Sequence, residues 1–333
     1  MKIVFYLSKY NTISDAVILY LKIINKSLTG QEDFKSTDSI KQLKGADLIV
    51  TYFVKDYLVA RILHPKTNII NWFQGVLPEE SLMWQKSKLR YHMYSFMEWF
   101  TLKSSDYNFF VSESMLLHYK RKYGYKGSNY YIMPCFNADI EPSFNSQRKL
   151  SFIYMGSLSA WQCIEETILT FKEINQELPE STLTILSSEK EKALKIIETT
   201  KVKNVKVDYI PLEMITNYLS DYKYGFLIRK NILVNRVSTP NKLNTYMASG
   251  VIPIYSDVIE SFKKSLSNVR YKIPLPETVD IKKAAKQIIG FERNVTIDYD
   301  RMHDNYVKVF EDFYNGENYS KEINEVLRKA EII

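Results

Sequence analysis

Short apolar runs alternate with helical segments through the second half of the chain, and this alternation constrains the fold more than any other feature. The runs have the length and composition of buried strands, and the segments between them carry apolar residues three and four positions apart. Because neighbouring parallel strands need a crossover connection, usually a helix, this order predicts a parallel sheet with helices on both faces. The strands are expected at 150–155, 182–187, 205–210, 225–229 and 251–255, and the helices at 164–177, 189–200, 212–222 and 240–249.

The first half of the chain has the same organisation. We expect strands at 2–7, 46–53, 68–72, 106–111 and 130–134, and helices at 13–27, 40–43, 81–104 and 113–123. The stretch 137–148 is polar and irregular, as in a linker. A chain of 333 residues has room for two domains. After residue 255 the pattern predicts a strand at 269–273 and helices at 256–266, 281–291, 298–314 and 319–330.

The amino-acid composition restricts the kinds of molecule that the protein is expected to bind. The net charge of +7 suits anionic small molecules or an anionic membrane surface, and no basic block or motif points to nucleic acid. The two cysteines, Cys135 and Cys163, lie among apolar neighbours and are expected to be buried free thiols in a reducing compartment. No apolar run reaches the ~18 residues of a membrane-spanning helix, so we expect a cytoplasmic protein.

The segment 224–255 carries the strongest functional signal. A strand ends at Arg229, a loop follows, and Thr239 and Pro240 have the residue types of an N-cap and a first helical position. Gly250 suits the left-handed turn that ends a helix. A helix N-terminus beside Arg229, Arg236 and Lys242 favours an anion, because backbone N–H groups and the helix dipole also attract negative charge. The alternative is a capped helix with solvated basic side chains.

The same segment resembles the donor-site segment of bacterial GT-B glycosyltransferases of the retaining, family 4 type. The matching pattern is R…N-R-x-S-x-P-x-K-L-x-x-Y-x-A-S-G-x-x-P-I, and the loop Y-x-G-S-L at 154–158 resembles a second donor-site loop of that family. The resemblance implies that the segment binds the diphosphate of a nucleotide sugar. Arg229 and Lys242 would be catalytic, and the donor-binding residues would be Gly156, Ser157, Asn235, Arg236, Ser238, Thr239, Pro240, Asn241 and Thr245.

One departure from the family concerns two glutamates that many members carry. Val237 and Thr245 stand at their positions here. Charge on the leaving diphosphate would be neutralised by Arg229 and Lys242, and amides at Gly156–Ser157 and at 239–242 would bind it. No metal and no other cofactor is expected.

Acceptor-side residues are expected in the first half. In the family this side is formed by loops after the first strands, which here offer Asn11, Thr12, Gln74, Gly75 and Glu79. The alternative for Glu79 is a carboxylate that favours the start of a helix.

The helical region 81–104 permits two interpretations. Its stretch 84–103 mixes lysines and an arginine with tryptophans, tyrosine and phenylalanines. Such a helix can lie on an anionic lipid surface, or it can be a core helix with a charged outer face. The first interpretation places the protein at the inner face of the membrane.

The resemblance implies an α/β protein with the GT-B fold, in which two Rossmann-like domains face a central cleft. The N-terminal acceptor-side domain would span 1–140, the donor-binding domain 149–312, and a C-terminal helix at 313–333 would cross back to the first domain. The implied activity moves a hexosyl group from a nucleotide sugar to a hydroxyl of a bacterial surface glycan, such as capsule or lipopolysaccharide, or of a lipid-linked oligosaccharide. The alternative is a non-catalytic GT-B subunit that binds a glycan or a partner glycosyltransferase.

Overall fold

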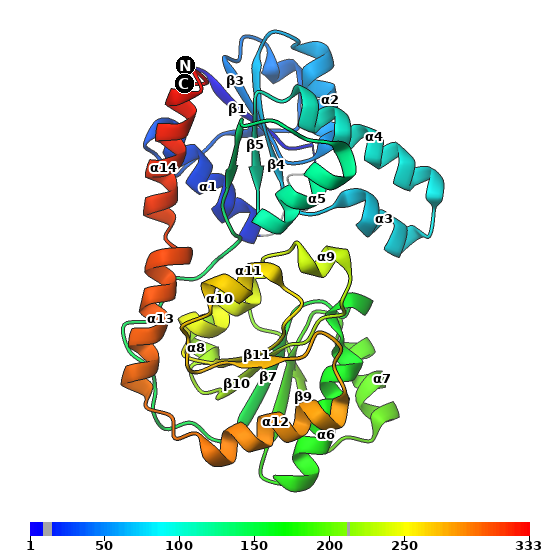
Figure 1. Ribbon diagram of the computed structural model, residues 1–333, viewed down its shortest axis with the longest axis vertical. Helices are drawn as coiled ribbons and strands as arrows, with labels where there is room; N and C mark the ends of the chain where they lie inside the picture. Colours follow the sequence, from blue (N-terminus) through cyan, green and yellow to red (C-terminus); the bar gives the residue numbers. More distant parts are fainter. Residues whose placement is uncertain (9–14, 212–213) are drawn as a thin grey trace. The chain divides into compact units, whose positions relative to one another are not determined.

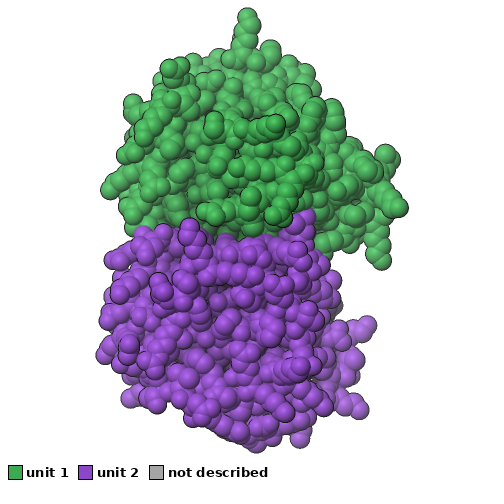
Figure 2. Space-filling view, in the orientation of Figure 1, with its two compact units in different colours: residues 1–136, 237–239, 315–333 green, residues 137–236, 240–314 purple. Residues whose placement is uncertain are grey.

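The structure, a computed structural model, describes residues 1–8, 15–211 and 214–333, and divides them into two compact units. Unit 1 comprises Met1–Phe136, Val237–Thr239 and Asn315–Ile333, and unit 2 comprises Asn137–Arg236 and Pro240–Tyr314 (Figure 2). Each unit is built around its own parallel sheet, whose strands and helices are labelled in Figure 1.

Unit 1 has a six-stranded parallel sheet in the order β2-β1-β3-β4-β5-β6. This is the flavodoxin-like order, with its reversal between β1 and β3. The strands are β1 (Ile3–Tyr6), β2 (Ser36–Thr37), β3 (Leu48–Thr51), β4 (Asn68–Phe73), β5 (Tyr107–Phe110) and β6 (Tyr130–Ile132). The helices are α1 (Asp15–Thr29), the 3-10 turn η2 (Ile40–Leu43), α2 (Val54–Leu63), α3 (Leu77–Gln85), α4 (Lys88–Ser104), α5 (Glu113–Tyr123) and α14 (Gly316–Lys329).

Unit 2 has a second six-stranded parallel sheet in the order β12-β11-β10-β7-β8-β9. Counted from β7, this is the Rossmann order, and it reverses between β7 and β10. The strands are β7 (Ser151–Met155), β8 (Thr182–Leu186), β9 (Val205–Asp208), β10 (Tyr224–Leu227), β11 (Ile252–Ser256) and β12 (Ile273–Leu275). The helices are the 3-10 turn η3 (Ala160–Gln162), α6 (Ile164–Glu177), α7 (Lys190–Thr200), α8 (Ile215–Leu219), α9 (Leu233–Arg236), α10 (Asn241–Ala248), α11 (Glu260–Ser265), α12 (Ile281–Asn294) and α13 (Tyr299–Phe313).

The predicted fold class, an α/β protein with two Rossmann-like sheets, is confirmed. Every residue of the central strands β3, β5 and β10 is buried, as expected for parallel strands covered on both faces. Gly225 in β10 permits a close helix approach, because a Cβ there would lie 2.7 Å from the ring of Tyr246 on α10. The buried hydroxyl of Tyr246 donates to the carbonyl of Phe226 at 3.2 Å, which fixes α10 on the sheet.

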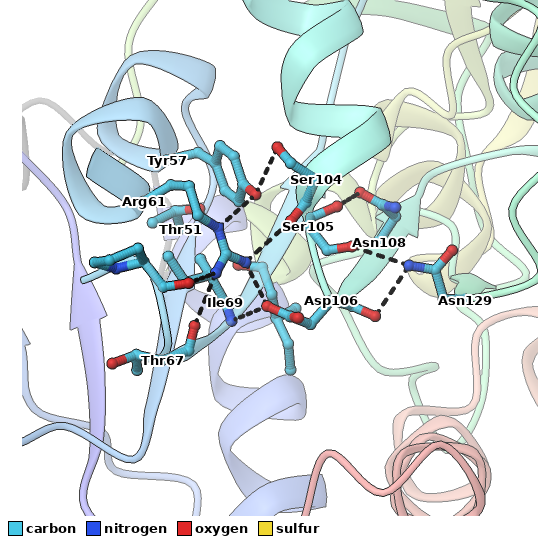
Figure 3. A network of polar contacts seen from close by, with 12 residues as sticks. Thr51, Tyr57, Arg61, Thr67, Ile69, Ser104, Ser105, Asp106, Asn108 and Asn129 are labelled. Carbon is cyan, nitrogen blue, oxygen red and sulfur yellow. Dashed lines mark hydrogen bonds and ion pairs between the residues drawn. The ribbon is translucent and has the colours of Figure 1, made fainter. Parts of the chain in front are cut away.

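A polar network at the amino-terminal edge of the unit 1 sheet ties helices to strands (Figure 3). The guanidinium of Arg61 on α2 pairs with Asp106 and donates to the Ser104 carbonyl at 3.0 Å. Asp106 also accepts the N–H of Ile69 in β4 at 2.7 Å. These contacts hold α2 and the start of β5 against β4.

The C-terminal helix packs within unit 1. In Figure 1, α14 lies alongside α1, and the two helices are in contact. Asn324 donates to the Ser27 carbonyl at 2.6 Å, and Lys26 pairs with Glu317. Helix α13 remains in unit 2, so the chain passes from one unit to the other at Tyr314–Asn315.

Several predicted elements are wrong in detail. The helix expected at 81–104 is two helices, because Lys86 takes a left-handed conformation and Ser87 caps α4 by accepting the N–H of Arg90. The strand expected at 269–273 begins only at Ile273. The loop expected around 231–236 contains the short helix α9. Helix α2 and the two-residue strand β2 were not predicted.

The expected start of the helix after Thr239 is also wrong. Pro240 is the N-cap residue of α10, and no side chain caps this helix. The Thr239 hydroxyl instead accepts the N–H of Cys135 at 2.9 Å. By contrast, Gly250 has the expected left-handed conformation, with φ of 68°. Both cysteines are free thiols as expected, but only Cys163 is buried and Cys135 is half-buried.

Candidate functional site

The reversal of strand order in unit 2 places three sequence-distant segments at one edge of its sheet. Strands β7 and β10 are hydrogen-bonded neighbours and run in the same direction, so their carboxyl ends meet. Gly156 follows β7, and Arg229 lies two residues after β10. Helix α10 starts at Asn241, and its second residue is Lys242. In Rossmann folds, ligands bind in this position.

Arg229 is a buried cation, and none of the residues that the structure describes forms an ion pair with it. Its side chain is only 6% exposed, and its backbone N–H donates to the Ser256 hydroxyl at 3.0 Å. The guanidinium Nε is buried and has no hydrogen-bond partner in the described parts of the chain. Burial lowers the pKa of Arg229, while the neighbouring Tyr154 acts in the opposite direction. A buried hydrogen-bond donor without a partner is destabilising. A ligand that offers a hydrogen-bond acceptor to this side chain would remove that cost.

Lys242 is the second cation of the site. Its Nζ donates to the Gln162 side-chain oxygen at 2.6 Å and lies 4.3 Å from the centre of the Tyr154 ring. Burial, followed by the charge of Arg229, lowers the pKa of Lys242 well below its ordinary value. The two cations also share a neighbour, because Tyr154 acts on the pKa of Arg229 and its ring lies next to the Lys242 ammonium group.

Gly156 makes room for the lysine. A Cβ at this position would lie 2.7 Å from Cε and 2.9 Å from Nζ of Lys242, and the backbone φ of 116° is itself unfavourable for other residues. The absence of a side chain at Gly156 therefore leaves the space that the Lys242 side chain occupies. The glycine's own N–H donates to the Leu186 carbonyl at 2.8 Å, so this amide is already hydrogen-bonded within the sheet, and its expected contact with a diphosphate stays a prediction.

Among the residues that the structure describes, no carboxylate pairs with Arg229 or Lys242. Two like charges, both partly or fully removed from water, destabilise each other unless an anion joins them. The first N–H groups of α10, which cannot bond within the helix, add further donors at its start. The arrangement is chemically suited to a polyanion such as a diphosphate.

The other predicted donor residues play different parts. Asn235 is buried, and its amide donates to the Lys230 carbonyl at 2.9 Å, so it shapes the loop. Arg236 is exposed and donates to Asn231 at 2.6 Å. The buried Thr245 hydroxyl lies 2.9 Å from the Asn137 side-chain oxygen.

The remaining donor-side predictions divide between the two units. Ser238 and Thr239 cluster with unit 1, whereas Pro240 and Asn241 belong to unit 2. The Asn241 side-chain oxygen is buried without a partner. Ser157 is exposed at the end of β7, where its carbonyl accepts the Tyr154 hydroxyl at 2.6 Å.

Unit 1 has a pocket of about 240 Å³ at the carboxyl ends of β3 and β4. Its lining includes the predicted acceptor-side residues Gln74 and Gly75. Two carboxyl groups that the sequence analysis did not select, Glu80 and Glu98, also line it. The full lining is Tyr52, Phe53, Val54, Phe73, Gln74, Gly75, Leu77, Glu80 and Glu98.

Glu79 is not among the residues that line this pocket. Its carboxylate pairs with Lys122 at 2.7 Å and lies 3.6 Å from His118. Burial alone would raise the pKa of Glu79, but the contacts with His118 and Lys122 bring it below its ordinary value. Asn11 and Thr12, the other predicted acceptor-side residues, lie outside the described residues.

A second pocket of about 340 Å³, in unit 2, differs from the site at Arg229 and Lys242, because its half-buried charges already have partners. Lys223 pairs with Glu292 at 2.7 Å, and Arg148 donates to the carbonyls of Tyr222 and Gly250 at 2.6 Å. Across the described parts of the chain, no cluster of three or more histidine, cysteine or acidic residues could hold a metal ion. The described helices include none long and apolar enough to cross a bilayer.

No protein-family model matches the chain, and no curated protein matches its sequence. Solved structures do match its fold, and they are GT-B glycosyltransferases. HepE from Anabaena, solved in complex with UDP-glucose, has a TM-score of 0.73 at 12% identity, covering 99% of this chain and 100% of that protein. Sucrose-phosphate synthase from Thermosynechococcus elongatus has a TM-score of 0.64 at 14% identity, covering 86% of this chain and 74% of that one.

TarM from S. aureus, solved with fondaparinux, α-GlcNAc-glycerol and UDP, has a TM-score of 0.63 at 12% identity and matches 94% of this chain. The present chain spans only 58% of TarM and 57% of the chain matched in the GtfA/B complex. At these identities the likeness establishes the GT-B fold.

Proposed function

We propose that the protein is a glycosyltransferase that moves a hexosyl group from a nucleotide sugar to a hydroxyl of a saccharide. The observation that supports this most is the pair Arg229 and Lys242, which lie together at the strand-order reversal of unit 2 and have no carboxylate partner among the described residues. A nucleoside diphosphate supplies the anion that this pair lacks. HepE, which shares the fold over its whole length, was solved with UDP-glucose bound.

In the proposed mechanism the two cations bind the diphosphate and stabilise the charge that develops on it as the glycosidic bond to the donor breaks. Preorganised donors of this kind act most strongly where water is excluded, and they need no rearrangement during the reaction. Arg229, held by the sheet, would provide a fixed contact, and Lys242 would shift from Gln162 to the phosphate oxygens. Side chains would neutralise this charge without a metal, and the family 4 resemblance implies that the anomeric configuration is retained.

The acceptor would bind at the pocket of unit 1. Phe53, Phe73 and Tyr52 supply apolar walls, and Gln74, Glu80 and Glu98 supply polar groups. Sugar rings combine an apolar face with hydroxyls at the rim, which suits this mixed lining. The pocket is smaller than the ~300–1,000 Å³ of drug-sized sites, so it would hold one sugar unit at the end of a glycan.

We further propose that the acceptor is a bacterial surface glycan, of the capsule or lipopolysaccharide type, or a lipid-linked oligosaccharide, and that the protein works at the inner face of the membrane. Helix α4 supports this, because its outward stripe is apolar: Leu89 is 82% exposed and Phe96 60%. Trp84 at the end of α3 is 66% exposed. Between residues 77 and 104 the exposed charged side chains are all basic, whereas Glu79, Glu80 and Glu98 are turned inward. Apolar groups flanked by cations suit an anionic lipid surface.

Vesicle co-sedimentation tests the membrane contact. The protein should bind phosphatidylglycerol vesicles and not phosphatidylcholine vesicles, and Leu89→Ser with Phe96→Ser should weaken this binding at least tenfold. Leu194→Ser, which alters an exposed leucine of α7 in unit 2, is the matched control and should bind as the parent does. Equal binding to both kinds of vesicle, or to neither, would argue against the membrane contact.

The transfer itself is tested by incubating the protein with a panel of nucleotide sugars and measuring the release of nucleoside diphosphate, with and without glycan acceptors. Release that depends on one donor and is lost in Arg229→Met would support the proposal. A non-catalytic subunit that binds a glycan or a partner glycosyltransferase would release none and would bind no nucleoside diphosphate. Absence of both release and binding of a nucleoside diphosphate would therefore favour the non-catalytic subunit over the proposed transfer activity.

A further inference from the structure

Glu98 is a buried carboxyl at the wall of the unit 1 pocket. It lies in the middle of α4, is 1% exposed, and contacts three side chains of α5. The Tyr123 hydroxyl is 2.6 Å from Oε2, the Tyr119 hydroxyl is 3.1 Å from Oε1, and Lys122 Nζ is 3.7 Å from Oε2. A carboxyl so far removed from water is ionised only where a positive charge compensates it.

The nearest positive charge is shared. Lys122 lies 2.7 Å from Glu79 and 3.7 Å from Glu98, so the closer carboxylate is its main partner. Three carboxyls belong to this region: Glu79 and Glu80 on α3, and Glu98 on α4. Tyr119 and Tyr123 are neutral, and His118 faces Glu79. One lysine cannot compensate all of these charges, and burial raises the pKa of Glu98 to about 8 in spite of it.

The number of protons available for hydrogen bonds gives a second, independent reason to expect a proton on Glu98. The Tyr119 hydroxyl has one proton but two oxygen neighbours, the Gly75 carbonyl at 3.0 Å and Glu98 Oε1 at 3.1 Å. If Glu98 carries a proton on Oε1, it donates to Tyr119, Tyr119 donates to Gly75, and Tyr123 donates to Oε2. Every contact is then a hydrogen bond. If Glu98 is ionised, Tyr119 must donate either to Glu98 or to Gly75, and one contact is lost.

We propose that Glu98 is a positioning residue of the unit 1 pocket that carries a proton and, through Tyr119, holds the Gly75 carbonyl in place. Gly75 is part of the pocket wall, and the next N–H, of Val76, donates to Glu80 at 3.1 Å. The Glu80 carboxyl lies directly over Gly75, where a Cβ would be 2.2 Å from its Oε1. The chain Glu98–Tyr119–Gly75 therefore fixes the segment against which Glu80 rests.

The proton also determines which ligand the pocket accepts. With Glu98 neutral, Glu80 is the one other carboxyl among the lining residues that the structure describes, so the wall carries one negative charge fewer than with both ionised. This favours the hydroxyls of an uncharged sugar unit over a cationic amino sugar more than an ionised Glu98 would. This choice of ligand rests on the proposed function. The proton on Glu98 and the position of Gly75 do not, and they can be tested on a protein that transfers no sugar.

Carbon-13 NMR of the protein labelled at glutamate Cδ tests the proton directly. One glutamate signal should titrate near pH 8. The signal should be absent from Glu98→Gln and present in Glu80→Gln. A spectrum in which every glutamate titrates below pH 6, or in which the high signal disappears with Glu80→Gln, would overturn the proposal. The parent spectrum alone can show that no glutamate titrates high, should Glu98→Gln fail to fold.

Unfolding equilibria provide a second readout. Because folding raises the pKa of Glu98, its contribution to stability is full below the unfolded value of 4.5 and is lost as pH rises towards about 8. The unfolding constant of the parent, relative to Glu98→Gln, should therefore rise about tenfold per pH unit in that window. A ratio that does not change with pH would contradict a proton on Glu98.

Hydrogen exchange separates positioning from simple packing. In Glu98→Gln the amide can still donate to Tyr119, so exchange at residues 73–76, corrected for the intrinsic rate, should match the parent at pH 7. Above pH 8 the parent should exchange several-fold faster than this variant. Tyr119→Phe should exchange faster at every pH, whereas Tyr123→Phe, which leaves the Gly75 contact intact, should not. Equal protection of residues 73–76 in Tyr119→Phe and the parent would overturn the positioning role.

Discussion

The two units differ in how their buried charged side chains are compensated. At the carboxyl edge of the unit 2 sheet, Arg229 and Lys242 repel each other and lack a carboxylate among the described residues. Beside the unit 1 pocket, a single lysine, Lys122, lies within 4 Å of two carboxyls, and tyrosine hydroxyls complete the network. The difference indicates that opposite charge and hydroxyls compensate most of the buried charge beside the unit 1 pocket, where Glu79 Oε2 and His118 Nε2 lack a hydrogen-bond partner among the described residues. In unit 2 two like charges need a ligand to compensate them.

The largest effect should follow removal of the buried arginine. Arg229→Met should lower kcat/KM for sugar transfer by about 10²–10³, because a fixed charge that stabilises the leaving diphosphate is lost. Arg293→Met is the matched control, since it removes an exposed arginine of the same unit that pairs with Glu177. Steady-state kinetics with the active donor checks this, and a loss of less than threefold in Arg229→Met would contradict the role assigned to it.

The same substitution should change stability in opposite directions in the two units. Lys122→Met should destabilise the protein by about 2–3 kcal/mol, because Glu79 loses its partner while it remains mostly buried. Lys242→Met should stabilise the free protein by about 1 kcal/mol, since it relieves repulsion with Arg229. Urea unfolding at pH 7 without ligands measures both changes. Destabilisation of similar size by both substitutions would remove the contrast between the units.

Gly156→Ala should weaken binding of a nucleoside diphosphate about tenfold. The added Cβ would collide with the Lys242 side chain at 2.7 Å and displace its ammonium group. Gly290→Ala in α12 is the matched control, because a Cβ there meets no atom within 4 Å and alanine favours a helix. Calorimetric titration of both variants with UDP compares them, and equal affinities would show that the space at Gly156 is not needed.

The pH dependence of binding should be the smallest effect. Folding lowers the pKa of Lys242 below its ordinary value of 10.5, so the unfolded chain binds more protons and stability without ligand rises as pH increases towards that value. A bound diphosphate favours the charged lysine, so its affinity should fall several-fold as pH rises through the lowered pKa. In Lys242→Met this slope should disappear. Titration with UDP from pH 6 to 9.5 measures it, and identical slopes in both proteins would contradict the assignment.

The sequence predicts the two sheets well, because alternating strands and helices leave few architectures for buried parallel strands. It does not predict the strand orders, which depend on contacts between distant segments. The expected start of the helix at residue 113 is confirmed, and Ser112 caps this helix by accepting the Met115 N–H at 3.0 Å, since a helix cap is a local signal.

The candidate site is predicted only in part. The sequence of the segment 224–255 predicts that Arg229 and Lys242 lie in the same site. It does not reveal that the Gly156 N–H donates to another strand of the sheet. Glu98 could not be found from the pattern, because the apolar residues Leu89, Met93 and Phe96 face outward on α4 and the glutamate faces inward. Helical periodicity assigns the opposite orientation to such a helix.

Calorimetric titration of the parent protein and of Lys242→Met with UDP, GDP and dTDP tests the central claim, that Arg229 and Lys242 together hold a diphosphate. We expect at least one nucleoside diphosphate to bind the parent, and the substitution to weaken that binding by about tenfold or more, since a charge-assisted contact contributes about 1.5–3 kcal/mol. Absence of binding to the parent by all three, or unchanged affinity in the variant, would contradict the account.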